Sequence, residues 1–245
     1  LFSDPNDRDA MNLGTSVVKE GEPLGLLYGR VATGIIKTQA QLEAAREEFS
    51  LWTIFNPYLN LGDIAYEYED GFWKEDVIGH ATPDFFGGYT NTINWNRFTL
   101  TALFTFSYGN DLIYQKDVSD SGMSSLANRG TRVLNHYSED NTSSNRPRSM
   151  WATTYMLSSL NVYDASYLKL KTLSLSYNLP ESICRKVRIK SASVYGTATN
   201  VFTITSYPGP DPEVSDDPTS VIGGGRDVST YPTVKSYTFG IRINF

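Results

Sequence analysis

The sequence predicts an all-β protein whose strands form part of a transmembrane antiparallel β-barrel. Three observations predict it: a strictly alternating final segment, long connections that alternate with short ones, and many aromatic residues. In residues 235–245, every second side chain is apolar, and those between them are polar or small. The apolar set is Tyr237, Phe239, Ile241, Ile243 and Phe245. Successive side chains of a strand point to opposite faces, so this pattern is typical of a barrel strand with lipid on one side and the lumen on the other.

The composition agrees with this fold class. The mean hydropathy of −0.32 is too polar for a helical membrane protein, and no apolar run reaches the ~18 residues that a spanning helix requires. The 16 Tyr, 12 Phe and 4 Trp suit aromatic girdles at membrane interfaces, or a sugar-binding surface. The net charge of −6 argues against nucleic acid as a partner. The single cysteine, Cys184, excludes an internal disulfide framework and a multi-cysteine metal site.

Residues 1–84 are expected to supply upstream barrel strands and an extracellular loop region. Within them, residues 38–49 predict a short amphipathic helix with a capping box between Thr38 and Gln41. Its packing stripe would consist of Leu42, Ala45 and Phe49.

An acidic stretch follows at residues 63–76. A calcium loop requires oxygen ligands at alternate positions around a glycine turn, but Tyr66 and Tyr68 interrupt the carboxylates here. A solvated acidic loop is therefore the preferred interpretation, with calcium as the disfavoured alternative. No metal site or other cofactor is expected.

Residues 85–245 are expected to form the last five barrel strands, and their connections alternate in length. The strands are expected at about 85–95, 97–108, 166–178, 188–202 and 235–245. The turn near Asn96 and the connection 179–187 are short, whereas the loops 109–165 and 203–234 are long. Outer-membrane barrels have short periplasmic turns and long extracellular loops, so this alternation assigns both long loops to the extracellular side.

The alternation also assigns a face to most strand residues. The residues expected to face lipid are Phe98, Phe104, Phe106, Leu173, Leu175, Phe239, Ile241 and Ile243. Those expected to face the lumen are Thr99, Thr101, Thr105, Thr238 and Arg242. In residues 166–178 the apolar set changes phase, which predicts a β-bulge near Lys171 and Thr172. In residues 188–202 neither face is more lipophilic, so the facing of that strand stays open.

Short motifs follow one another in a fixed order along most of the chain. They are Glu20–Gly25, Tyr28–Gly29, Gly34–Ile35, Gly62–Ile64, Ile78–Gly79, Thr82–Phe85, Tyr108–Asn110, Ser166–Lys171, Tyr177–Pro180, Thr199–Thr203, Tyr207–Glu213 and Phe239–Phe245. Together with the final strand, they make the chain resemble the C-terminal part of a SusC/RagA-type TonB-dependent transporter of the Bacteroidota.

The resemblance implies an energised importer of the bacterial outer membrane, not an enzyme. Such transporters have a barrel of about 22 strands with a plugged lumen. They take up oligosaccharides or peptides together with a SusD-like surface lipoprotein that closes the extracellular mouth. TonB would act through an N-terminal part that nothing in this chain matches. The resemblance also implies that Phe245 belongs to the signal read by the barrel-insertion machinery.

Five to eight strands cannot close so wide a barrel. Open strand edges in lipid would leave unpaired backbone groups at several kcal/mol each. We therefore expect this chain to be one piece of a longer or nicked polypeptide, with the remainder of the transporter as its partner.

No catalytic residues are expected. His80 and His136 are expected to lie far apart in polar surface loops, and no Gly-x-Ser-x-Gly elbow exists for a serine nucleophile. The run Gly223–Gly225 lacks the rest of a phosphate-binding motif and predicts a flexible loop tip.

Aromatic residues in the loops are the candidates for substrate contact, because their rings stack on sugars or on peptide side chains. The candidates are Trp52, Trp73, Trp151 and Tyr207. The alternative is that these rings pack loop against loop or contact the lipoprotein.

Two other classes of protein remain open at this stage. One is a complete small outer-membrane adhesin or binding barrel, and the other is a soluble β-sandwich that binds carbohydrate. The upstream coding sequence would show or lack a plug and a TonB box, and detergent dependence would separate the barrels from the soluble protein.

Overall fold

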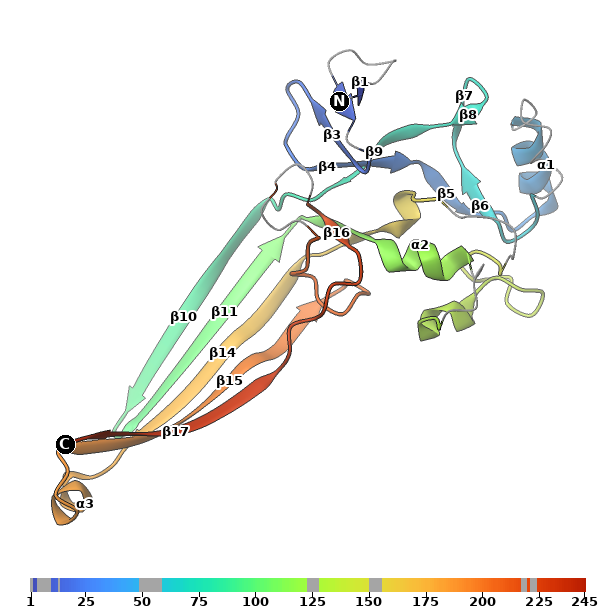
Figure 1. Cartoon of the computed structure of the whole chain (residues 1–245). Helices are drawn as coiled ribbons and strands as arrows, with labels where there is room; N and C mark the ends of the chain where they lie inside the picture. The colour runs from blue at the N-terminus through green and yellow to red at the C-terminus, as the bar shows by residue number, and fades with distance from the viewer. Residues whose placement is uncertain are drawn as a thin grey trace. The chain divides into compact units, whose positions relative to one another are not determined.

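The computed structural model describes residues 2–3, 10–12, 14–48, 59–122, 128–149, 156–216, 220 and 224–245 (Figure 1). The chain forms two compact units. Unit 1 comprises Leu1–Thr82, Asp111–Tyr163 and Val214–Thr230, and unit 2 comprises Pro83–Asn110, Asp164–Glu213 and Tyr231–Phe245. This division differs from the expected boundary between residues 84 and 85, because most of both long loops packs with the N-terminal residues. Within the described residues, no helix is both long and apolar enough to cross a membrane.

Unit 2 is a single antiparallel sheet of five long strands, which lie side by side in Figure 1. In sheet order they are β10 (Phe85–Trp95), β11 (Phe98–Tyr108), β14 (Tyr167–Asn178), β15 (Ser191–Thr205) and β17 (Ser236–Asn244). The all-β prediction is confirmed. Strand β15 starts and ends three residues later than expected, because the short helix α3 (Glu181–Lys186) and a turn with positive φ at Arg188 lengthen the connection before it.

Strands β10 and β17 form the two edges of this sheet and do not pair with each other. The described strands therefore do not close into a small barrel by themselves. This finding speaks against the alternative of a complete small adhesin barrel.

The predicted β-bulge in β14 is confirmed. Against β11, Leu103 pairs with Thr172 and Phe104 pairs with Leu170, so Lys171 has no residue opposite it. The register shifts at the same place against β15. The extra residue returns the apolar side chains on both sides of the bulge to one face of the sheet.

The register shows which side chains share a face. Three rows run from β10 to β17: Trp95–Phe98–Tyr177–Val194–Ile241, Ile93–Leu100–Leu175–Gly196–Phe239, and Asn91–Ala102–Leu173–Ala198–Tyr237. All eight residues expected to face lipid lie on the face that contains these rows, which we call the apolar face. The five residues expected to face the lumen lie on the opposite, polar face. Strand β15, whose facing was open, places Val194, Gly196 and Ala198 on the apolar face.

Three glycines of the sheet, Gly87, Gly196 and Gly240, lie opposite aromatic residues of the neighbouring strand, and two of them lie between β15 and β17. Tyr195 pairs with Gly240 on the polar face, and Phe239 pairs with Gly196 on the apolar face. A Cβ atom added at Gly240 would lie 2.5 Å from the Tyr195 ring, so this ring covers the glycine. Such pairs stabilise a sheet at positions where glycine would otherwise weaken it.

We expect Gly240→Ala to lower the free energy of unfolding of the whole protein by about 1–3 kcal/mol, because the methyl group would displace the Tyr195 ring. Gly88→Ala, also on the polar face, is the matched control. Its Cβ would meet no atom closer than 3.4 Å, so the change should be neutral or stabilising by up to about 1 kcal/mol. Urea titration measures both values, and equal effects would contradict the proposed contact.

Unit 1 consists of short strands, helices and connecting segments. One sheet has the order β1 (Phe2–Ser3), β2 (Ala10–Asn12), β3 (Ser16–Lys19), β4 (Leu26–Arg30) and β9 (Glu75–His80). Strand β5 (Ala32–Ile35) pairs with β6 (Ile64–Tyr66), and β7 (Tyr68–Glu69) pairs with β8 (Phe72–Trp73). A three-stranded sheet has the order β13 (Val162–Asp164), β12 (Asp111–Tyr114) and β16 (Arg226–Asp227). The helices are α1 (Gln39–Glu48), α2 (Gln115–Gly122), and the 3-10 helices η3 (Thr131–Asn135) and η4 (Ser159–Asn161).

Helix α1 begins with the predicted capping box. The Thr38 N–H donates to the Gln41 side chain at 3.0 Å, and the Gln41 N–H donates to Thr38 Oγ1 at 3.2 Å. Leu42 is buried and Ala45 is half-buried, as expected for the packing stripe. Phe49, its third member, lies outside the described residues.

The acidic stretch 63–76 is not a solvated loop, because strands β6, β7, β8 and the start of β9 occupy most of it. Asp63 is 4% exposed, and its carboxylate accepts hydrogen bonds from the Arg148 guanidinium at 2.7 and 3.2 Å. The expectation was wrong for Asp63 because a bidentate arginine offsets the cost of burying a carboxylate. The expectation of a loop was also wrong for His80, which is the last residue of β9.

Candidate functional site

The apolar face of the unit 2 sheet has the properties of a surface that lies against hydrocarbon. None of the residues that the register places on this face is charged. Many of its large side chains are exposed, among them Trp95 (73%), Phe239 (82%) and Ile241 (68%). An exposed apolar surface of this extent indicates an interaction site or a membrane.

Aromatic rings bound the apolar face at both ends. At one end, Phe85 stacks on Tyr108 with ring centroids 5.0 Å apart. At the other, the Phe98 ring lies 6.3 Å from Trp95 and 4.7 Å from Tyr177. An extended strand from Phe85 to Trp95 covers about 34 Å. At the 35–45° tilt of barrel strands this corresponds to a height of about 25 Å, which matches the apolar band of such barrels.

The polar face is rich in hydroxyl groups, which pair across strands. Examples are Ser174 with Thr197 at 3.0 Å and Thr199 with Ser236 at 2.7 Å. Phe86 also lies on this face and is 77% exposed. Phe86 is not among the aromatic residues predicted to contact substrate, because those were chosen from the loops and Phe86 lies in a strand.

A cluster of ion pairs on the polar face ties the loop after β15 to strand β14. We call it the clasp and define it as Lys169, Lys171, Asp211, Glu213 and Thr233. The Lys169 side chain is 1% exposed, and its ammonium group lies 3.0 Å from Asp211 and 2.6 Å from Glu213. Lys171 reaches Glu213 at 2.9 Å, and Asp211 also accepts hydrogen bonds from the Thr233 hydroxyl and N–H. The clasp therefore fixes both ends of the segment between residues 211 and 233 to the same strand.

Both carboxylates of the clasp stay ionised. Burial raises the pKa of Asp211, but the Thr233 hydroxyl, the Glu213 N–H and Lys169 outweigh it and hold this pKa below its usual range. Burial also raises the pKa of Glu213, but the hydrogen bonds that Lys169 and Lys171 donate to its carboxylate outweigh burial and hold this pKa below its usual range. Two ammonium groups thus face two carboxylates, and the charges of the clasp balance.

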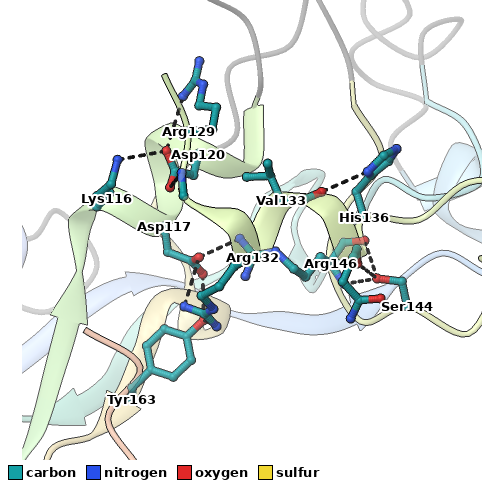
Figure 2. A network of polar contacts seen from close by, with 12 residues as sticks. Lys116, Asp117, Asp120, Arg129, Arg132, Val133, His136, Ser144, Arg146 and Tyr163 are labelled. Atoms are coloured by element: carbon teal, nitrogen blue, oxygen red, sulfur yellow. Dashed lines mark hydrogen bonds and ion pairs between the residues drawn. The ribbon is translucent and has the colours of Figure 1, made fainter. Parts of the chain in front are cut away.

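Unit 1 contains a second polar network, shown in Figure 2. Asp117 of α2 accepts hydrogen bonds from Arg146 at 2.7 Å and from the Tyr163 hydroxyl at 2.6 Å (Figure 2). The pKa of Tyr163 is raised, mainly by burial of its hydroxyl group and secondly by its hydrogen bond to Asp117. Arg132 approaches the same carboxylate at 3.4 Å. The network holds together segments of unit 1 that lie far apart in the sequence.

The four candidate substrate-binding aromatics have different outcomes. Trp52 and Trp151 lie outside the described residues. Trp73 is half-buried in β8, and the Arg30 guanidinium lies 4.1 Å from its ring centroid, so a cation occupies one face. Tyr207 is 5% exposed and its ring covers Gly209. The expectation for Tyr207 is corrected: its ring packs inside its own loop and offers no open face to a substrate.

Phe245 and Cys184 have contrasting surroundings. Phe245 directly follows β17 and is 92% exposed. Cys184 lies in helix α3 and is 2% exposed.

Within the described residues, no group of His, Cys, Asp and Glu side chains is arranged to hold a metal ion.

Comparisons with known proteins agree with one another, although no protein-family model matches the chain. The chain is similar to three TonB-dependent receptors of Formosa agariphila. Receptor P3 is 30% identical over 100% of this chain, P39 is 24% identical over 98%, and P26 is 26% identical over 97%. The chain spans only 24–27% of the length of these relatives.

Solved structures share the fold. The RagAB peptide transporter matches 97% of this chain with a TM-score of 0.72 at 24% identity. The RagAB peptide importer matches with a TM-score of 0.70 both in its open-open state, at 23% identity, and in its closed-closed state, at 25%. These matches cover 96–97% of this chain and 24–25% of the solved chains.

Proposed function

We propose that this chain is the C-terminal barrel segment of an outer-membrane importer. Its full length is similar to a segment that makes up 24% of TonB-dependent receptor P3. The complete transporter takes up oligosaccharides or peptides, with energy supplied by TonB through the N-terminal part. The named relatives are receptors and an importer, so the chain belongs with transport proteins and not with enzymes.

The observation that carries this proposal is the apolar face of the unit 2 sheet. It is free of charge, it is bounded by aromatic rings at both ends, and its height fits a bilayer core. In the proposal, the apolar face contacts lipid and the polar face lines the lumen. The clasp then lies on the inner wall of the barrel, and the short turn at Asn96 lies at the periplasmic end.

The remainder of the transporter is the partner that this sheet requires. Strands β10 and β17 each have one edge without a paired strand within the described residues. In hydrocarbon each unsatisfied backbone group costs several kcal/mol, so we propose that both edges pair with strands of the same barrel.

A SusD-like lipoprotein is the proposed second partner. It would close over the loops 109–165 and 203–234, which the alternation of loop lengths assigns to the extracellular side. Trp73, whose ring has one face against Arg30, and the exposed Phe86 are proposed to contact substrate along the import path.

Uptake by the native bacterium tests this function. The gene for the whole transporter is deleted, and growth is measured on oligosaccharides and on peptides as the limiting nutrient. We expect growth on one substrate class to be lost, and to be restored by the intact gene but not by a version without the TonB box. Growth on the constituent sugars or amino acids is the control and should not change. Normal growth of the deletion strain on every oligosaccharide and peptide would refute the import function.

Deletion of Phe245 tests its proposed role in barrel assembly. We expect less folded barrel in outer-membrane fractions with unchanged synthesis, because the insertion machinery would no longer read the final aromatic residue. Phe245→Tyr keeps an aromatic ring and is the control. If the deletion variant assembles as well as the intact protein, Phe245 is only an exposed apolar residue.

A further inference from the structure

The apolar face contains a hollow of about 470 Å³ between strands β11, β14, β15 and β17. Its floor consists of the small residues Gly196 and Ala198. Phe98 and Tyr177 bound it toward the end of the sheet that carries the two short connections, which we call the short-turn end. Tyr237 and Phe239 bound it along β17. The side chains that line it on this face are apolar or aromatic, so a flexible hydrocarbon chain fits its chemistry.

The short-turn end of the same sheet is strongly basic. Five cationic residues lie in the turn after β10 and in the connection that contains α3: Arg97, Arg185, Lys186, Arg188 and Lys190. Glu181 is the only acidic residue in these two connections, and it pairs with Arg185 at 3.0 Å. Within the described residues, no carboxylate lies within ion-pair distance of the other four cations.

The hollow and the basic end are adjacent along the strands. Arg97 directly precedes Phe98, and Lys190 directly precedes β15, whose Val194 lines the hollow. Helix α3 extends from this end of the sheet (Figure 1), and its Ile183 (47%) and the following Val187 (61%) are exposed among the basic residues. Exposed apolar side chains among cations are typical of a segment at a lipid headgroup layer.

We propose that this end of the sheet binds an anionic phospholipid, with an acyl chain in the hollow and its phosphate group against Arg97, Arg188 and Lys190. The proposal rests on the proposed function, which places the short turns in the periplasm and therefore selects the inner leaflet of the outer membrane. Charge complementarity identifies the headgroup and the apolar lining identifies the chain. Basic residues at a membrane surface attract anionic lipids by about 1 kcal/mol each, or about fivefold in affinity.

Electron spin resonance of the whole transporter in phosphatidylcholine vesicles tests this inference. The probes are phosphatidylglycerol and phosphatidylcholine, each spin-labelled near the end of one acyl chain. We expect the protein-immobilised fraction to favour phosphatidylglycerol severalfold at low salt. The preference should fall toward one at about 1 M salt, where the screening length is about 3 Å. This comparison requires no variant, so it does not depend on any mutant folding.

Two pairs of variants locate the site. Arg97→Gln combined with Arg188→Gln and Lys190→Gln should abolish the preference, whereas Arg242→Gln, which removes a cation from the polar face, should leave it unchanged. Ala198→Phe should fill the hollow and release both labelled lipids, whereas Ala102→Phe, on the same face but outside the hollow, should not. Heat-modifiable gel mobility verifies that each variant is folded.

Three outcomes would overturn the inference: no preference in the unaltered transporter, a preference that survives the triple substitution, or immobilisation unaffected by Ala198→Phe. A dimer of the transporter that Ala198→Phe dissociates would also overturn it, because a second copy would then fill the hollow. If neither lipid is immobilised at all, the sheet does not face lipid and the proposed function fails instead.

Discussion

Replacing Lys169 with methionine is expected to lower the free energy of unfolding of the whole transporter by about 3–5 kcal/mol. The Lys169 side chain is 1% exposed and neutralises two carboxylates. Without it, Asp211 and Glu213 would remain in the clasp with only Lys171 as a cation. Urea titration of the folded barrel in detergent measures the loss.

Lys171→Met is the matched control, because it makes the same substitution two residues along the strand. Lys171 is 44% exposed and, within the described residues, its ammonium group forms an ion pair with Glu213 alone, so solvent screens this pair and the loss should stay below about 1 kcal/mol. Equal losses for Lys169→Met and Lys171→Met would contradict the central position of Lys169 in the clasp.

The clasp should also make stability depend on pH in the acidic range. Its carboxylates have a lower pKa in the folded than in the unfolded protein. Their contribution is therefore complete above the unfolded value of about 4 and is lost as the pH falls through the lower folded values. The Lys169→Met variant should lose this dependence in part, because the lysine contributes to holding both pKa values low.

The second large effect is expected from a charge on the apolar face. Leu173→Arg should lower the free energy of unfolding of the membrane-inserted protein by about 2–4 kcal/mol, since Leu173 lies near the middle of β14 and, in the proposed barrel, an arginine there would meet the bilayer core. Folded barrel in outer-membrane fractions, and urea titration in vesicles, measure the effect.

Ser174→Arg is the control for this prediction, because Ser174 is the next residue and lies on the polar face. Its hydroxyl pairs with Thr197, so a loss of no more than about 1 kcal/mol is expected. If Ser174→Arg were the more damaging of the two, the assignment of lipid to the apolar face would be reversed.

Local pattern was sufficient to predict the strands and the bulge. The alternation in β11 and β17 and the change of phase in β14 are each contained in about a dozen neighbouring residues. Strand β15 could not be oriented in this way, because both of its faces carry small or weakly polar residues. Its orientation follows from its neighbours, since Leu175 and Phe239 flank Gly196 in the register.

The clasp and the buried Asp63 were not predicted, for a different reason. Lys169 and Asp211 are separated by 42 positions, and Asp63 and Arg148 by 85. No periodicity links residues so far apart, and the path of a long loop back to its strand depends on packing that the local pattern does not contain. A lysine on the polar face of an alternating strand was the available sign that an acidic partner was needed.

The bulge at Lys171 makes β14 sensitive to its number of residues as well as to their chemistry. Side chains alternate with a period of two, and Leu170 and Leu173 share the apolar face only because Lys171 has no residue opposite it. The loss of one residue between them would leave a regular strand in which Leu170 and Leu173 are two positions apart and still share that face. The loss of both Lys171 and Thr172 would make Leu170 and Leu173 neighbours, and one end of the strand would turn over. Between these two leucines, therefore, a single deletion preserves the alternation on both sides, whereas a single deletion elsewhere in β14 would not.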